Sequence, residues 1–293
     1  MSDDAEEESA FSHPTVAPDA TASYGEHPDQ VVDFYAPRVG DGRPAPLVVV
    51  LHGGAWRAPY DRQHLTPFAD FLARRGFAVA NVEYRRGPGD IPPQGTAVPH
   101  QGAQAPVAGR WPETFDDVAA AVDALPALVP SHLPQADPRR VVLTGHSAGG
   151  HLALWAAARH VLPADSPWHL ARPTPLRGVV ALAPIVGFER AVELDVCGGA
   201  PVQLLGGKAK FADRVPLADP AALLPTGIAT TLVQGRTDTT VPYELAEEYA
   251  DAAAKSGELV GCTLLEGVGH FPLIDPAADA CAVVAEEIAQ LAF

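Results

Sequence analysis

The sequence predicts an α/β protein with a mostly parallel central sheet and helices on both of its faces. From about residue 30 onward, short apolar runs alternate with segments of helical periodicity along the 293-residue chain. Most of the apolar runs are continuous, which is typical of strands that are buried on both faces. Strands that alternate with helices in this order predict parallel pairing and a helical layer on each side of the sheet.

The expected elements follow one another without an internal repeat or a dividing linker. The strands are expected at residues 31–35 (an edge strand), 46–51, 77–84, 139–144, 176–182, 229–234 and 262–265. The helices are expected at residues 66–75, 111–128, 151–159, 243–256 and 276–293. This organisation predicts a single α/β domain over residues 30–293.

Acidic residues are concentrated at the N-terminus. The chain has a formal net charge of −16, and its first thirty residues contain no Lys or Arg. Half of the excess negative charge comes from the acids of this segment: Asp3, Asp4, Glu6, Glu7, Glu8, Asp19, Glu26 and Asp29. We expect residues 1–29 to form a flexible acidic tail. The remaining body is moderately acidic, which argues against nucleic-acid binding, because that function needs a basic face.

The N-terminal segment has neither a basic start nor an apolar stretch, so a secretory signal is not expected. No run of about eighteen apolar residues is present, so no membrane span is expected either. The sequence thus favours a cytoplasmic protein without a membrane partner, and it leaves the oligomeric state open.

Two segments interrupt the alternation of strands and helices. Residues 87–110 are rich in Gly and Pro and have no apolar periodicity, so they are expected to form either a functional flap or a mobile insert without direct chemistry, and the insert is favoured. Residues 187–225 have weak periodicity and several prolines, and they lie between two expected core strands. This position predicts a small cap region over a site at the edge of the sheet.

A nucleophile motif occupies the turn after the expected strand at residues 139–144. Residues Gly145-His146-Ser147-Ala148-Gly149 match the pattern G-x-S-x-G. The two glycines allow a sharp strand-to-helix turn that exposes the serine oxygen above the sheet. The strand before the motif and the helix after it supply the context that such a turn needs, so Ser147 is the candidate nucleophile.

A second glycine motif ends the expected strand at residues 46–51. Its glycines, Gly53 and Gly54, let backbone N–H groups approach a substrate oxygen, while the N–H of Ala148 supplies the other donor. These groups form a candidate oxyanion hole, and His52 is expected to orient the loop through hydrogen bonds. Trp56 is a tentative substrate-binding residue, either as an aromatic wall for the substrate or as a side chain packed under the loop.

A serine nucleophile needs a base, and the base needs an acid that orients it. His270 follows the expected strand at residues 262–265, and Asp238 follows the strand at residues 229–234. Both would lie at the carboxyl ends of neighbouring strands, where open α/β sheets place their sites. Three other acids are weaker candidates by chain order or position: Asp195, Asp275 and Glu266.

Taken together, the motifs HGGAW, GHSAGG, GRTDTTVP and GVGHF resemble the α/β-hydrolase superfamily. The chain is most similar there to carboxylesterases and acetyl esterases related to hormone-sensitive lipase, and to arylformamidases, which use a similar HGG-x-W motif. The resemblance covers the chain from about residue 30 to the end and implies an α/β-hydrolase fold with a small cap insertion. The site residues that it implies are the triad Ser147, Asp238 and His270 and the oxyanion hole Gly53, Gly54 and Ala148.

One departure bears on the substrate. Ala55-Trp56 stands where the hormone-sensitive-lipase pattern usually has a third glycine, which favours formamidase or feruloyl and acetylxylan esterase branches. The leading hypothesis is a serine carboxylesterase that acts on a small acyl substrate through an acyl-enzyme. The alternative is an arylformamidase that hydrolyses N-formylkynurenine with the same triad.

A peptidase is less favoured, because no accessory domain that would select peptides is evident in the sequence. A non-catalytic binding protein of the same fold is also less favoured, because every position that catalysis requires carries a suitable residue. No cofactor is expected. No metal is expected either, since no His, Asp or Glu cluster has ligand spacing.

Overall fold

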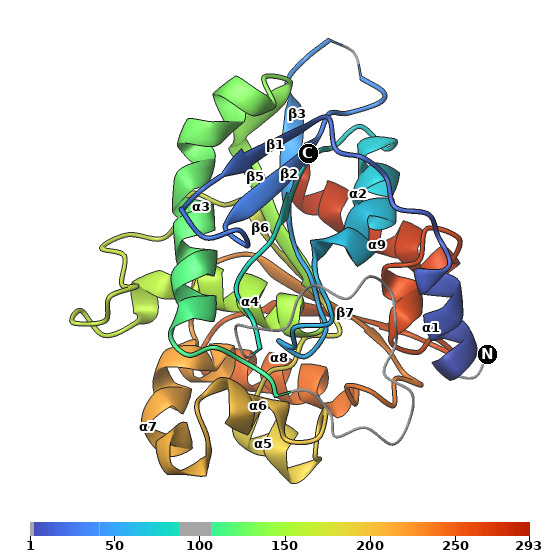
Figure 1. Cartoon of the computed structure of the whole chain (residues 1–293). Helices are drawn as coiled ribbons and strands as arrows, with labels where there is room; N and C mark the ends of the chain where they lie inside the picture. Colours follow the sequence, from blue (N-terminus) through green and yellow to red (C-terminus); the bar gives the residue numbers. More distant parts are fainter. Residues whose placement is uncertain (1–2, 41, 88–106) are drawn as a thin grey trace.

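A computed structural model describes residues 3–40, 42–87 and 107–293 of the chain. Its centre is an eight-stranded sheet of order β1-β2-β4-β3-β5-β6-β7-β8 (Figure 1). Strand β2 runs antiparallel to both of its neighbours, β1 and β4, and the strands from β4 to β8 in this sheet order run parallel to one another. The strands are β1 Ala20–Ser23, β2 Val31–Tyr35, β3 Ala45–Leu51, β4 Ala78–Val82, β5 Ala136–His146, β6 Gly178–Leu182, β7 Thr230–Gly235 and β8 Val260–Leu265. The predicted fold class is therefore confirmed.

Helices cover both faces of this sheet, as Figure 1 shows. Side chains of α3, α4 and α8 belong to the core on one face, and those of α2 and α9 belong to the core on the other. The helices are α1 Asp3–Phe11, α2 Thr66–Ala73, α3 Glu113–His132, α4 Ala148–Ala157, α5 Phe188–Glu193, α6 Ala200–Leu204, α7 Lys208–Ala218, α8 Glu244–Lys255 and α9 Asp279–Ala292. Short 3-10 helices connect some of these elements, among them η1 Arg62–Leu65, η3 Pro220–Leu223 and η4 Phe271–Leu273.

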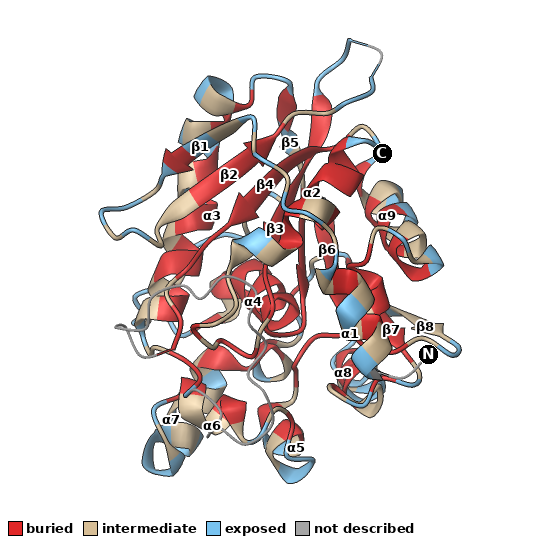
Figure 2. Ribbon diagram, turned by 45° about the vertical axis from the view of Figure 1, so that its right-hand side comes forward, coloured by how far each residue is buried: buried red, intermediate tan, exposed pale blue. Residues whose placement is uncertain are grey.

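Strand β3 illustrates why the apolar runs are continuous. Its side chains alternate between the two cores, with Val49 in the core under α3 and α4, and Val48 and Val50 in the core under α2 and α9. All seven residues of the strand are buried, as are all residues of β4 and β6 (Figure 2). Burying each such side chain contributes about 1.5–3 kcal/mol, so both faces of the strand stabilise the sheet.

The N-terminal segment differs from the flexible tail that we expected. Residues 20–23 form β1, which pairs with β2, so the strand expected at the edge lies one position inside it. Helix α1 packs against η4, where the Phe11 and Phe271 rings meet edge to face at 5.5 Å. Glu6 is buried and accepts a hydrogen bond from the Gly269 N–H at 3.3 Å. The acidic composition suggested solvation, but these long-range contacts order the segment.

The segment between β6 and β7 contains α5, α6, α7 and η3, which gather at one end of the molecule (Figure 1). Its two ends are tied together by Asp219, whose carboxylate accepts from the N–H groups of Gly187 at 3.0 Å and Phe188 at 2.7 Å. We expected a small cap at residues 187–225, and this helical insertion occupies that range.

Most of the loop insert expected at residues 87–110 lies outside the described residues. In the part of the chain that the structure describes, no helix combines the length and the apolar character needed to span a bilayer.

Candidate active site

Ser147 lies on a strained turn between β5 and α4. Its backbone has φ 57° and ψ −117°, a region that side-chain-bearing residues rarely adopt. The turn requires glycine on both sides. A Cβ on Gly149 would lie 2.0 Å from the Leu51 carbonyl oxygen, and one on Gly145 would lie 2.3 Å from the Gly149 oxygen. The glycines of the predicted motif therefore let β3, β5 and α4 approach one another closely enough to form this turn.

His270 and Asp238 lie together after neighbouring strands, as their positions in the sequence suggested. His270 Nδ1 is 2.6 Å from Asp238 Oδ2. The other oxygen of this buried carboxylate accepts from the N–H groups of Thr240 at 2.9 Å and Val241 at 2.7 Å, and Gln234 Nε2 donates to Oδ2 at 2.9 Å. Three donors besides His270 hold the aspartate as an acceptor, so Nδ1 of His270 carries a proton and Nε2 can act as a base.

Ser147 and His270 line the same cavity, which has a volume of about 430 Å³. Gly54 and Ala55 from the loop after β3 line it as well, and Tyr60 and Arg57 lie further along that loop. Asp238 does not line the cavity and lies behind His270. The structure thus brings the candidate nucleophile, the candidate base and part of the glycine loop to one concave site.

His146 connects the nucleophile turn to the loop that carries the base. Its Nε2 donates to the His270 carbonyl oxygen at 3.0 Å, and the two imidazole rings lie 4.3 Å apart. Burial lowers the pKa of His146 well below its ordinary value, and the neighbouring His270 lowers it further. His146 is therefore neutral at physiological pH, and its contact keeps the two loops in register.

The predicted oxyanion residues lie around Ser147. A Cβ on Gly53 would approach the His146 carbonyl oxygen to 2.8 Å and the Ser147 Cβ to 3.4 Å, so this residue directly abuts the turn. Gly54 has φ +101°, and a Cβ there would collide with the Tyr60 side chain. Ala148 is the first residue of α4, where a helix leaves N–H groups without an intrahelical partner. Backbone donors and the positive helix end can together bind an anion there.

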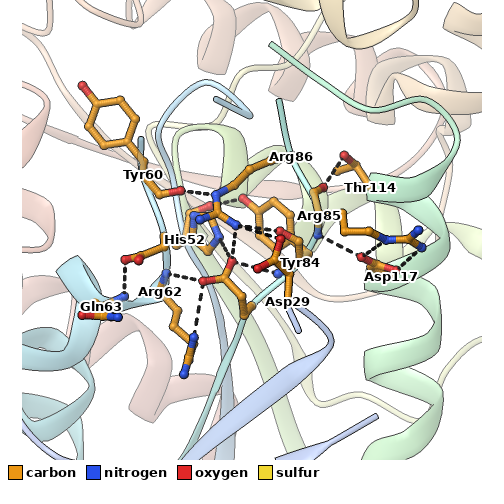
Figure 3. Close-up of polar contacts among 12 residues, drawn as sticks. Asp29, His52, Tyr60, Arg62, Gln63, Tyr84, Arg85, Arg86, Thr114 and Asp117 are labelled. Atoms are coloured by element: carbon orange, nitrogen blue, oxygen red, sulfur yellow. Dashed lines mark hydrogen bonds and ion pairs between the residues drawn. The ribbon is translucent and has the colours of Figure 1, made fainter. Parts of the chain in front are cut away.

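Under this loop lies a buried cluster of polar side chains (Figure 3). His52 is fully buried, and its Nε2 is 2.9 Å from Glu83 Oε1 while its Nδ1 is 2.8 Å from the Gly53 carbonyl oxygen. Tyr84 donates its hydroxyl to the His52 carbonyl at 2.5 Å. These contacts give His52 a role in orienting the glycine loop.

Trp56 lies in the core and does not line the cavity. Its ring packs edge to face on His151 at 5.1 Å and against Phe188 at 5.9 Å. Its backbone carbonyl accepts from the N–H groups of Gly87 and Gly109, at 3.0 Å and 2.9 Å. Of the two roles that the sequence allowed, the structure places Trp56 in the packing role.

The rival acids are engaged elsewhere. Asp275 accepts from the Ser9 hydroxyl at 2.6 Å and pairs with His13 at 2.7 Å. Glu266 pairs with Arg236 at 2.7 Å, and Asp195 is exposed in the insertion between β6 and β7. No group of three or more His, Cys, Asp or Glu side chains that could hold a metal ion occurs among the described residues.

Two contributors to the site were missed by the sequence reasoning. Helix α1 places Asp4, Glu7 and Phe11 along the cavity. Burial raises the pKa of the Glu7 carboxyl, and Asp4 adds to that shift, while His270 opposes it. The second contributor is Glu83, which follows β4 and is 2% exposed. A charged residue inside the mostly apolar run at residues 77–84 was the signal that could have identified it.

The fold agrees with that of known proteins. A family model described as the alpha/beta hydrolase family matches residues 48–283 of the chain. This range contains both glycine motifs, the acid and the base, and it leaves out β1, β2 and helix α1.

Curated relatives are similar over most of the chain. Esterase LipC of Mycobacterium tuberculosis is 26% identical over 87% of this chain and 60% of its own length. The isoprenylcysteine alpha-carbonyl methylesterase ICME of Arabidopsis thaliana is 26% identical over 85% of this chain and 56% of its own. The chain therefore spans only a little more than half the length of the curated relatives that it matches.

Solved structures share the fold at low sequence identity. A truncated carbohydrate esterase from gut microbiota superposes with a TM-score of 0.73 at 17% identity, covering 95% of this chain and 99% of its own. Esterase 2 of Thermogutta terrifontis, phosphoramylated by tabun, superposes with a TM-score of 0.66 at 18% identity, covering 95% of each chain.

Proposed function

The chain belongs to the alpha/beta hydrolase family, and on that premise we propose that it hydrolyses a carboxylic ester of a small acyl substrate. The observation that carries the proposal is the placement of Ser147. This residue lies on a strained turn and lines the same cavity as His270. The Nδ1 atom of His270 is hydrogen-bonded to the buried Asp238. A hydroxyl is inert at neutral pH unless a base lies beside it, and this arrangement supplies one.

In the proposed reaction, His270 Nε2 takes the proton of Ser147 as its oxygen attacks the substrate carbonyl. The imidazolium that forms is stabilised by its hydrogen bond to Asp238, whose carboxylate also accepts from three other donors. The imidazolium then protonates the leaving alcohol, and an acyl-enzyme remains on Ser147. Water that His270 deprotonates releases the acid and restores the serine.

The carbonyl oxygen becomes negatively charged in the tetrahedral intermediates. We assign the backbone N–H groups of Gly53, Gly54 and Ala148 as its donors, because this loop and the start of α4 both adjoin Ser147. Preorganised donors of this kind each contribute about 10²–10³-fold to kcat in related chemistry. The names of LipC and ICME, both esterases, add support for an ester as the substrate.

A short-chain ester assay combined with a serine-directed probe tests the proposal. The wild-type chain is expected to hydrolyse 4-nitrophenyl acetate and to form a fluorophosphonate adduct on Ser147. Ser147→Ala is expected to lose both, with a fall in kcat of at least about 10⁴-fold. Absence of turnover and of the adduct in folded wild-type protein would argue for a binding protein.

The arylformamidase alternative is decided in the same assay series. Both substrates need the same triad, so only the comparison of kcat/KM values separates them. A value for N-formylkynurenine more than tenfold above that for the acetyl ester would replace the ester proposal with the formamidase one. A higher value for the ester would support the proposal as stated.

A further inference from the structure

We propose that His52 is a buried imidazolium whose counterion is Glu83, and that its positive charge strengthens the oxyanion hole through the peptide that joins Gly53 to Gly54. The charge state follows from the buried cluster alone. The effect on the oxyanion rests on the function proposed above.

The hydrogen bonds of the ring require two protons. His52 Nδ1 lies 2.8 Å from the Gly53 carbonyl oxygen, and Nε2 lies 2.9 Å from a carboxylate oxygen of Glu83. A carbonyl oxygen and a carboxylate oxygen only accept hydrogen bonds, whereas a neutral imidazole can donate from one nitrogen only. Because His52 is fully buried, bulk water cannot supply a hydrogen bond to either acceptor in place of a missing ring proton. Both contacts are satisfied only by the imidazolium.

Glu83 is held as the carboxylate that this charge needs. Its Oε1 also accepts from the Tyr84 N–H at 3.0 Å and from Arg86 Nη1 at 2.8 Å, and its Oε2 accepts from the Arg62 N–H at 3.0 Å. Burial raises the pKa of Glu83, whereas a charged His52, the charge of Arg86 and these hydrogen bonds together lower it to about 2, so the charges of His52 and Glu83 stabilise each other. Every donor around the Glu83 carboxylate therefore favours its ionised form.

The surroundings of the ring suit a cation. The Tyr84 ring stacks parallel on His52 with centroids 4.1 Å apart, a geometry that places a positive charge over an aromatic face. The ion pairs of the cluster also involve Arg62 with Asp33, and Arg86 with Asp29. Each of these two guanidinium groups thus has a carboxylate partner besides Glu83.

The neighbouring histidine, His64, is neutral. His64 lies with its ring 5.9 Å from that of His52. Burial lowers the pKa of His64 to about 3, and the neighbouring His52 lowers it further. Of these two histidines, His52 is therefore the one that can hold a positive charge.

The link to catalysis is covalent. The Gly53 carbonyl that accepts from His52 and the Gly54 N–H belong to one peptide group. A charged donor on the carbonyl pulls electron density from the peptide and makes its N–H a stronger donor, as happens in hydrogen-bonded chains. The charge that develops on the substrate oxygen then meets a donor polarised by His52. His52 and Glu83 are thus positioning and polarising residues that do not touch the substrate.

Nitrogen NMR of the full chain with ring-labelled histidine tests the charge state directly. At pH 8 an ordinary histidine is neutral and shows one protonated and one unprotonated ring nitrogen. Among the eleven histidines of the chain we expect one that keeps both ring nitrogens protonated. In Glu83→Gln this signature should disappear, and in Glu83→Asp it should remain. A wild-type spectrum without an imidazolium at pH 8, or one whose imidazolium persists in Glu83→Gln, would overturn the assignment.

Ester hydrolysis by the same variants tests the effect on the oxyanion. Glu83→Gln is expected to lower kcat on the order of tenfold with KM changed less than about twofold, because the polarised donor acts on the transition state. Glu83→Asp should recover most of the loss. Asp117→Asn is the matched control, since Asp117 is also a buried carboxylate paired with an arginine, Arg85, at 2.6 Å, and it lies away from the glycine loop.

The outcomes separate the two halves of the proposal from the proposed function. An unchanged kcat in Glu83→Gln, or an equal loss in Asp117→Asn, would overturn the role of the charge in catalysis. If Glu83→Gln does not fold, the wild-type spectrum and Glu83→Asp still decide the charge state. A wild-type chain that hydrolyses no ester but shows the imidazolium would contradict the proposed function alone.

Discussion

The loop after β3 and helix α1 line the same cavity, but different forces hold them in place. The loop rests on a cluster of buried charges, in which His52 and Glu83 are almost inaccessible to solvent. Helix α1 is attached from outside by a few side-chain contacts, chiefly Ser9 and His13 to Asp275 and the Phe11 ring to Phe271. The loop lies within the range of the family model, residues 48–283, and the helix lies before it.

This difference teaches how the chain divides its tasks. The parts that the proposed chemistry needs are embedded in the sheet and its buried cluster, so their geometry is tied to the stability of the whole fold. Helix α1 lines the cavity with two carboxylates, Asp4 and Glu7. Neither of them takes part in the proposed bond-breaking steps. Changes in the embedded region should therefore alter rate, and changes in α1 should alter local order and selectivity.

The largest effect is expected at the embedded acid. Asp238→Asn keeps the size of the side chain but removes the acceptor that sets the tautomer of His270, so kcat for ester hydrolysis should fall by about 10⁴-fold. Steady-state kinetics and circular dichroism of the purified variant measure this. A variant that folds and loses less than about tenfold would show that another group orients His270.

A smaller effect is expected where α1 is attached. The hydrogen bonds that Asp275 receives from Ser9 and His13 lower its pKa against the opposing effect of burial, so they stabilise the carboxylate in the folded chain. Removing both donors with Ser9→Ala and His13→Ala should lower the free energy of local opening of α1 by about 1–3 kcal/mol. Hydrogen exchange of the α1 amides measures this opening, while kcat should change less than about threefold.

Ser12→Ala is the control for this attachment, because the exposed Ser12 hydroxyl bonds only the Ser9 carbonyl within the same segment. It should leave the exchange of α1 unchanged. If the double variant exchanged like the wild type, the contacts to Asp275 would not be what holds the helix.

The smallest effect is expected on selectivity. Glu7→Gln removes a negative charge from the cavity, so an anionic substrate should gain relative to a neutral one by about threefold, the size of one screened charge interaction. The ratio of kcat/KM for the 4-nitrophenyl monoester of succinic acid to that for 4-nitrophenyl butanoate measures the gain. Glu8→Gln is the matched control, since Glu8 is exposed on the same helix and does not line the cavity.

The selectivity should also depend on pH. Burial raises the pKa of Glu7, so this carboxyl takes up a proton at a higher pH than an exposed glutamate does. As the pH falls from 7 towards the raised pKa, the wild-type ratio should approach that of Glu7→Gln. If the ratio of the two kcat/KM values in the wild type stayed constant down to the ordinary glutamate pKa of 4.5, a group other than Glu7 would determine the selectivity.

The sequence predicted the embedded region well because its signals are local. The apolar run of β3 predicts a buried strand, and the glycines at positions 145 and 149 predict a sharp turn. Each of these signals lies within a few residues of the structure that it predicts. The strand expected at residues 31–35 was found with the same bounds, and only its position at the edge was wrong. The role of Glu83 was not predictable, because its donors come from segments that meet only in the folded chain.

The N-terminal segment shows the opposite case. Its acids and its lack of apolar periodicity are typical of a solvated tail, yet Ser9 bonds a residue 266 positions away. Ordering of such a segment depends on which surface the rest of the chain presents to it. Local composition carries no information about that surface, so neither α1 nor β1 was expected.

The order of the sheet has a consequence for how the protein should respond to heat. Ser147 follows β5, which is paired on both sides by β3 and β6, whereas the loop of His270 follows β8, the strand at the end of the sheet. Ser147, the proposed nucleophile, can move only if two ladders break, while His270, the proposed base, can move when one edge and its attachment to α1 loosen. Warming should therefore separate the base from the nucleophile before the sheet melts, and inactivation at moderate temperature should be reversible on cooling.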